Sequence, residues 1–152
     1  MLDQFTDKDD YDQSDKVHWM KVAVSDRNSD QDNKKTRTLS SVYKQLSSRP
    51  DHGDAVIDYV NLDLEGGEWQ VIPQLVSSGM IGNIKQLNIE VHYSNQSVEA
   101  MRSYVAVVKS LESAGMVRFA SRPNIFWPSK FFGMNDYFMY EIAWYNRRFF
   151  FY

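Results

Sequence analysis

The fold of this 152-residue chain is limited most strongly by residues 56–69, which read VIDYVNLDLEGGEW. The pattern is typical of a buried strand that ends in an acidic turn, where Gly66 and Gly67 let the backbone pass directly into a helix. Pro73 stands within that helix, so we expect either a first-turn position or a kink there. Residues 84–93 then have the pattern of a second strand. Two strands joined by a helix make one unit of an open α/β sheet.

The rest of the chain alternates between strand and helix patterns. Strands are expected at 17–25, 116–120 and 137–146, helices from Thr38 or Ser40 to Pro50 and from Val98 to Gly115, and loops at 26–36 and 123–133. Such alternation implies a mainly parallel α/β sheet with right-handed crossovers. Because no convincing helix joins the last two strands, we expect these two to pair antiparallel.

Residues 1–16 are rich in aspartate and have little to bury, so we expect an acidic, flexible lead-in before one domain over 17–152. This lead-in lacks the basic start and apolar run of a signal peptide. No stretch of the sequence is long and apolar enough to span a membrane. These patterns therefore assign no compartment to the chain.

Composition removes several function classes. A net charge of −3 with scattered basic residues gives no electrostatic footprint for nucleic acid. The absence of cysteine removes disulfides, thiolate metal sites and cysteine nucleophiles. The sequence contains no G-x-G phosphate loop, Walker motif, G-x-S-x-G elbow or H-E-x-x-H motif. A hydrolase or nucleotidase would therefore depend on acidic residues alone.

Candidate site residues lie where the two central strands end. Asp63 and Glu65 share one side of the first strand, and Glu90 and His92 share one face of the second. Ligands of open α/β sheets bind beyond the carboxyl ends of the strands, so these groups could meet in one crevice and hold a metal ion or move a proton. The structural alternative is an acid that caps the helix and a histidine with a purely structural role. Glu68 reads as a first-turn helix residue.

With TLSSVYKQL, IKQLNIEVHY and EIAWYNRR, the segment NLDLEGGEW resembles the FkbM-type S-adenosylmethionine-dependent methyltransferase domain, most closely its animal methyltransferase-like protein 24 subgroup. The resemblance covers residues 17–148. It implies the three-layer, Rossmann-like fold of class I methyltransferases, with strand order 3-2-1-4-5-7-6 and an antiparallel seventh strand. On that template, the strands that resemble the third to the seventh are 17–25, 57–64, 84–93, 116–120 and 137–146.

The same template implies that part of the domain is missing. In the family, the first strand ends in a glycine loop at the methionine end of the cofactor, and the second ends in an acid that binds the ribose. Neither has a counterpart here, so the chain resembles the carboxyl-terminal two-thirds of a domain without its first two strands. An unpaired central strand is an aggregation hazard, so we expect an open edge beside 57–64 or a rearranged third strand there.

The resemblance also assigns roles to residues. Asp63 matches the acid that ends the fourth strand, near the methyl donor and the acceptor. Asp63, Glu65 and Gly66 form the expected site for S-adenosylmethionine, the implied cofactor. Asp63, Glu90 and His92 form the expected catalytic set. No residue is assigned to a resident metal ion.

Three functions follow as expectations. The first is a truncated or partial methyltransferase that transfers a methyl group to oxygen of a small-molecule or glycan-like acceptor. The second is a non-catalytic binding module that keeps the scaffold without the cofactor site. The third and weakest is a metal-dependent hydrolase that uses Asp63, Glu65 and His92.

Overall fold

The protein is described by a computed structural model that covers residues 2, 9–14, 17–31, 34–49, 55–93, 97–131 and 133–150, with side chains at 131, 134 and 135 not described. The chain divides into two compact units, Met1–Gly53 and Asp54–Tyr152. The predicted limit of the acidic lead-in, between residues 16 and 17, falls inside the first unit. In the described residues, no helix is long and apolar enough to cross a membrane.

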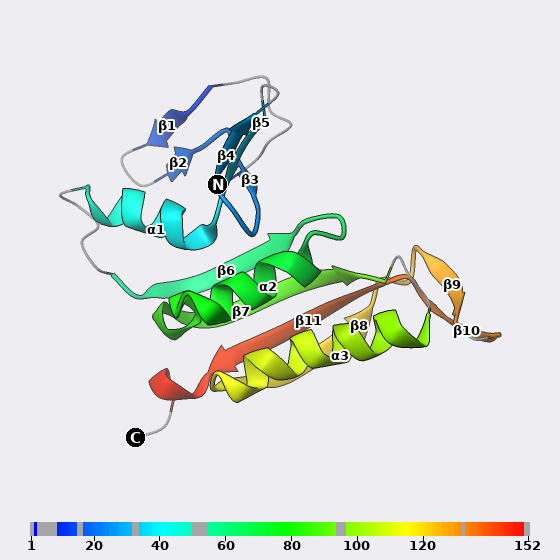
Figure 1. The fold of residues 1–152 in the computed structure, drawn as a ribbon. Helices are drawn as coiled ribbons and strands as arrows, with labels where there is room; N and C mark the ends of the chain where they lie inside the picture. The colour runs from blue at the N-terminus through cyan, green and yellow to red at the C-terminus, as the bar shows by residue number, and fades with distance from the viewer. Residues whose placement is uncertain are drawn as a thin grey trace. The chain divides into compact units, whose positions relative to one another are not determined.

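The first unit contains two small sheets and one helix (Figure 1). In one sheet, two strands pair antiparallel; in the other, a central strand pairs parallel with one neighbour and antiparallel with the second. The strands of the first sheet are β1 (Tyr11–Ser14) and β2 (Val17–Trp19), and those of the second, in spatial order, are β3 (Ala23–Val24), β5 (Lys34–Arg37) and β4 (Ser29–Gln31).

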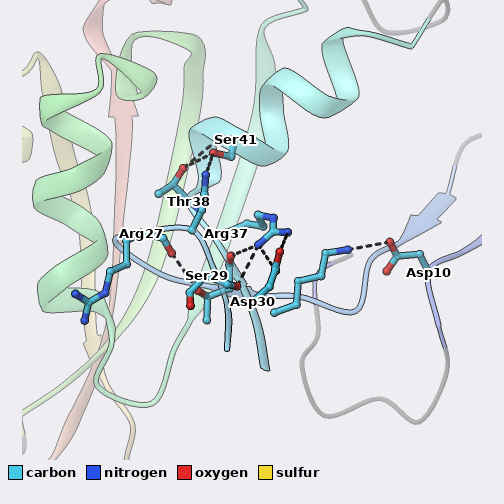
Figure 2. A network of polar contacts seen from close by, with 10 residues as sticks. Asp10, Arg27, Ser29, Asp30, Arg37, Thr38 and Ser41 are labelled. Carbon is cyan, nitrogen blue, oxygen red and sulfur yellow. Dashed lines mark hydrogen bonds and ion pairs between the residues drawn. The ribbon is translucent and has the colours of Figure 1, made fainter. Parts of the chain in front are cut away.

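Two expectations for this unit are wrong. The strand predicted at 17–25 is broken, because the N–H of Val22 bonds to the carbonyl of Met20 in a tight turn that ends the extended chain. The loop predicted at 26–36 contains β4 and most of β5. Polar side chains hold this hairpin: the Arg37 guanidinium lies 2.6 Å from the Asp30 carboxylate, as Figure 2 shows. A hairpin held by polar contacts has no hydrophobic alternation for a sequence pattern to detect.

Helix α1 (Leu39–Ser47) begins where the sequence predicts. Thr38 is its N-cap, and its hydroxyl accepts a hydrogen bond from the N–H of Ser41 at 3.1 Å (Figure 2). The core of this unit consists of Met20, Val22 and Val42. It is a small core that one helix and a few short strands can enclose.

The second unit is built on a four-stranded mixed sheet in the order β6-β7-β11-β8 (Figure 1). β6 is parallel to β7, whereas β11 is antiparallel to both β7 and β8. The antiparallel pairing predicted for the last two strands is therefore present. The four strands are β6 (Ile57–Asp63), β7 (Ile84–His92), β8 (Met116–Pro123) and β11 (Met139–Asn146).

The aromatic loop predicted at 123–133 is wrong in part. Strand β9 (Pro128–Phe131) forms a hairpin with β10 (Met134–Tyr137). Pro128 takes the first position of its strand, where its missing N–H is tolerated. The two prolines and the lack of alternation concealed this hairpin in the sequence.

Helices cover one face of this sheet (Figure 1). α2 and α3 contact each other, and α2 joins β6 to β7 as predicted. Pro73 lies in the interior of α2 on its exposed side, so the first-turn alternative is wrong. Fully buried side chains include Ile72 and Leu75 of α2 and Ile89 and Trp144 of the sheet. The bounds are α2 (Glu68–Ser77), η1 (Met80–Asn83), α3 (Val98–Ser113) and, at the end of the chain, η2 (Arg147–Phe149).

Buried and exposed side chains alternate along β6. Val60 and Leu62 are buried, while the alternating residues Tyr59, Asn61 and Asp63 are exposed. Among the described strands, β7 alone pairs with β6, so its other edge is open in this part of the chain. Asp63 therefore ends a parallel strand at the sheet edge where α/β proteins bind ligands.

Candidate functional site

A tight turn after β6 brings its acidic residues together. The N–H of Gly67 bonds to the carbonyl of Leu64 at 3.0 Å, and Glu65 and Gly66 both take positive φ angles, +51° and +101°. Glu65 is the only described non-glycine residue with positive φ, a conformation that is costly for a glutamate. Glu68, the first residue of α2, closes this turn: its Oε1 accepts the N–H of Leu64 at 2.8 Å and that of Gly66 at 3.2 Å.

His92 joins this turn from the end of β7. Its Nδ1 lies 3.2 Å from Glu68 Oε1. Its Nε2 lies 3.5 Å from Glu65 Oε2 and 3.9 Å from Asp63 Oδ1. The imidazole is buried, with 7% of its side chain exposed, and Glu68 is completely buried. Asp63 and Glu65 are 49% and 80% exposed, so the cluster has a closed inner side and an open outer side.

The end of β7 is held in place by an aromatic group. Trp69 donates its indole N–H to the carbonyl of His92 at 2.7 Å. The same ring stacks on Tyr104 with centroids 4.0 Å apart and contacts Tyr93 at 5.4 Å. These contacts tie α2, α3 and β7 together immediately beside the imidazole. The position of His92 is therefore set by packing as well as by its hydrogen bond.

The cluster carries an excess of negative charge. Three carboxylates lie within 4.0 Å of a single imidazole. The second oxygen of Glu68, Oε2, is buried and has no hydrogen-bond partner among the described residues. A buried carboxylate oxygen without a partner is expensive, and a nearby positive charge is the usual compensation. The arrangement can hold a proton on the imidazole or bind a cation.

The structure brings together three of the predicted side chains and leaves one apart. Asp63, Glu65 and His92 meet in the cluster, and Gly66 forms the turn beneath it. Glu90 lies opposite Asp63 in the strand register, but its Oε1 accepts a hydrogen bond from Asn124 Nδ2 at 2.9 Å. Its catalytic role stays a prediction.

Sequence reasoning missed the part played by Glu68, which was expected to be an ordinary first-turn residue. The available signal was the turn itself: a tight turn at two glycines leaves nearby backbone N–H groups, here those of Leu64 and Gly66, for an acid at the next helix start to accept. Its carboxylate also contacts His92, 24 residues later, and no local pattern contains that information.

A cavity of about 590 Å³ lies between α3 and the strands β8 and β11. Its wall includes Tyr93, the residue after His92, together with Tyr104, Tyr137 and Tyr140. Burial raises the pKa of the Tyr93 phenol. The hydrogen bond from the Tyr140 hydroxyl to the Asp136 carboxylate raises the pKa of Tyr140 to about 12. Both phenols therefore stay protonated near neutral pH, and the hydroxyl of Tyr140 already donates to Asp136.

Parts of the chain are similar in sequence to known proteins. The probable methyltransferase-like protein 24 of Homo sapiens is 26% identical over 125 residues, which cover 74% of this chain and 32% of the human protein. The protein of the same name from Rattus norvegicus gives the same identity and coverage. The chain thus spans about a third of the length of these curated relatives. No solved structure matches it.

The family match is broader than the matches to single proteins. A model of the family described as "Methyltransferase domain" matches residues 2–135, a range that includes the acidic turn and His92. Neither this match nor the relatives support the metal-dependent hydrolase alternative. Because the match extends over most of its length, the chain belongs to this methyltransferase-domain family.

Proposed function

We propose that this domain takes part in S-adenosylmethionine-dependent methyl transfer to a hydroxyl oxygen, as a methyltransferase of the FkbM type. One observation carries the proposal. A buried glutamate, Glu68, holds His92 so that its Nε2 faces two carboxylates that reach solvent, Asp63 and Glu65. These groups stand at the carboxyl ends of two parallel strands, where α/β enzymes place their chemistry.

The topology of the second unit supports the Rossmann-like expectation. In class I methyltransferases the fourth, fifth, seventh and sixth strands are neighbours in that order, and the seventh is antiparallel. The order β6-β7-β11-β8, with β11 antiparallel to both of its neighbours, is consistent with this arrangement. On that template β6 takes the fourth place, and Asp63 is the acid at its end.

S-adenosylmethionine supplies the methyl group in such enzymes, and the described residues make only part of a site for it. The turn formed by Asp63, Glu65 and Gly66 is that part. Among the described strands, none with a glycine loop borders the open edge of β6. We therefore assign the acceptor side of the reaction, rather than a complete cofactor site, to the described residues.

The cluster suits the acceptor side for a chemical reason. An attacking hydroxyl must lose its proton as its oxygen bonds to the methyl group, so a base is needed within hydrogen-bond reach. If Nδ1–H of His92 donates to Glu68, the lone pair of the imidazole is on Nε2, which faces the open side. Asp63 is exposed enough to meet an acceptor directly.

The cavity lined by tyrosines supports a small-molecule or glycan-like acceptor. Aromatic rings present flat apolar faces for sugar rings or other carbon skeletons, while phenol hydroxyls supply directional hydrogen bonds. Tyr93 links the cavity to the cluster by sequence, since it follows His92 directly.

A second candidate is a non-catalytic module that binds the acceptor without transferring a methyl group. The open edge of β6 in the described part of the chain favours it, because the neighbouring half of a cofactor site is not among these residues. The two candidates differ in one measurable property, the transfer of label from the cofactor to an acceptor.

The test is methyl incorporation from S-adenosylmethionine labelled on its methyl group, with the protein purified as the cell makes it and a panel of hydroxyl-bearing acceptors. Asp63→Asn should lower kcat/KM by roughly 10²-fold or more, the usual share of a positioned proton acceptor. Asp58→Asn is the matched control, since Asp58 lies on the same strand, is 83% exposed and pairs only with Lys85 at 2.6 Å among the described residues.

The outcomes separate the two candidates. Incorporation that falls with Asp63→Asn and persists with Asp58→Asn supports the methyltransferase. Acceptor binding without any incorporation by the wild-type protein supports the non-catalytic module. Equal incorporation by the wild type and Asp63→Asn would remove Asp63 from the reaction.

A further inference from the structure

We propose that Asp63, Glu68 and His92 bind one divalent metal ion, with Glu65 as an adjustable fourth ligand on the open side. Each of the first three residues offers one nitrogen or oxygen ligand atom, and these three atoms lie within 4.8 Å of one another. They come from three separate positions, the end of β6, the start of α2 and the end of β7. Two strand ends and one helix start therefore bring the three side chains together without an ion.

The distances around His92 fit an ion better than direct hydrogen bonds. Nε2 lies 3.9 Å from Asp63 Oδ1 and 3.5 Å from Glu65 Oε2, and both separations exceed the range of N–H···O bonds. Two ligand atoms that bind one ion at about 2.1 Å each, with a tetrahedral angle between them, lie about 3.4 Å apart. The observed gaps are of this size, with the longer one needing a wider angle.

Glu68 gives an independent reason to expect a cation. Its side chain is completely buried, and its Oε2 has no partner among the described residues. Its Oε1 is already used by two backbone N–H groups and by His92. A buried carboxylate with one oxygen unpaired lacks positive charge, and a divalent ion beside Oε2 would supply it.

The ligand types indicate the class of metal. One imidazole nitrogen with carboxylate oxygens suits Zn²⁺ or Mn²⁺, whereas Mg²⁺ and Ca²⁺ prefer oxygen alone and Cu⁺ prefers sulfur. His92 offers the ion its Nε2, which faces Asp63 and Glu65.

This inference deepens the proposed function, because an ion at this position would bind the acceptor hydroxyl and lower its pKa, and the released proton would pass to water. Metal binding itself requires neither the methyl donor nor an acceptor. The competing explanation is a protonated His92 that serves as the only counter-ion of the three carboxylates. In that case, added metal would compete with a proton and find no open site.

The experiment uses the full chain, stripped with EDTA and dialysed, and measures thermal unfolding with Zn²⁺, Mn²⁺ or Mg²⁺ added. At an ion concentration of 100 Kd, one specific site should raise Tm by about 5 °C or more in a chain of this size. Zn²⁺ or Mn²⁺ should act well below the concentration at which Mg²⁺ does. Co²⁺ should give visible absorption bands that saturate at one equivalent, which is a direct signature of protein ligands.

Two variants make the test specific. Asp63→Asn changes a half-exposed side chain and should fold, yet it should weaken Co²⁺ binding at least about tenfold because a ligand is lost. His18→Gln is the matched control in the first unit, where His18 Nδ1 lies 2.5 Å from Asp12 Oδ1 in another histidine–carboxylate pair. It should leave both the Tm shift and the Co²⁺ bands unchanged.

Three results would overturn the metal site: no Tm shift and no Co²⁺ bands in the wild type, equal binding by Asp63→Asn, or loss of binding with His18→Gln. None of them bears on methyl transfer, which is measured separately with EDTA present. Incorporation that survives EDTA while Co²⁺ fails to bind would leave the proposed function standing with a protein base.

Discussion

Replacing Glu68 by alanine should destabilise the second unit far more than its place in the first turn of a helix suggests. The Glu68 carboxylate accepts the N–H of Leu64 at 2.8 Å, the N–H of Gly66 at 3.2 Å and the Nδ1 of His92 at 3.2 Å. Alanine removes all three acceptor contacts at once. It also leaves a void where a completely buried side chain stood.

The magnitude follows from these contacts. A buried donor that loses its acceptor costs about 1–3 kcal/mol, and the lower end applies here because the turn is only partly buried. The loss of the two backbone contacts, the imidazole contact and the filled volume together costs about 3–5 kcal/mol. Removal of the buried, unpaired Oε2 stabilises the variant by about 1 kcal/mol. We therefore expect Glu68→Ala to lower the free energy of unfolding by about 2–4 kcal/mol.

Two further variants define the cause. Glu68→Gln keeps an oxygen for the two N–H groups and removes the charge, so it should cost about 1 kcal/mol or less. Glu99→Ala is the matched control, because Glu99 is also a first-turn glutamate, in α3, but is exposed. It loses only the interaction with the helix dipole, about 0.3–1 kcal/mol.

The assay is urea unfolding with EDTA present, followed by circular dichroism and by tryptophan fluorescence so that the two units can be resolved. The reasoning is refuted if Glu68→Ala costs no more than Glu99→Ala. It is also refuted if Glu68→Gln costs as much as Glu68→Ala, because the hydrogen bonds to the turn would then not be the source of the stability.

Three other predictions concern the second unit. Gly66→Ala should cost about 1–3 kcal/mol in urea unfolding, because the φ of +101° is strained for alanine even though its Cβ would meet nothing within 4 Å. Gly82→Ala is the control: its Cβ would lie 3.8 Å from the nearest atom, and it should change stability by less than about 0.5 kcal/mol. The raised pKa of Tyr140, about 12 against 10.0, means that its stabilising contribution is complete below pH 10 and is lost as pH rises toward 12. Phenolate absorbance should show late-ionising tyrosines, Tyr140 and Tyr93 among them, and Asp136→Asn should return the pKa of Tyr140 toward 10. Leu111→Ala should cost about 2–5 kcal/mol in the same unfolding assay, since Leu111 is the one buried residue of α3, all of which the structure describes.

The central strand–helix–strand unit could be predicted from sequence because its signals are local. β6 and β7 end within one residue of the predicted limits, and the apolar spacing of α2 ends at Gly79, which takes a φ of +73°. Each of these features is determined by residues next to one another in the chain. Hydrophobic period and glycine placement are sufficient for such elements.

The elements that the sequence did not predict depend on contacts between distant or polar residues. β4 and β5 are joined by the Arg37–Asp30 pair, and β9 and β10 by backbone hydrogen bonds that begin at a proline. Neither pair has the alternating apolar residues on which strand prediction relies. The same limitation applies to the site, where the buried carboxylate of Glu68 contacts the end of another strand.

Because the candidate cluster lies within one strand–helix–strand unit, its geometry is largely independent of the rest of the chain. Asp63, Glu65 and Glu68 belong to one turn, and His92 ends the strand that pairs directly with β6. No residue of the first unit and no partner at the open edge of β6 is needed to form these contacts. Proton or metal chemistry at the cluster can therefore be present whether or not a cofactor site is completed beside it. For this reason, the proposed metal binding and the proposed methyl transfer can be tested by separate measurements.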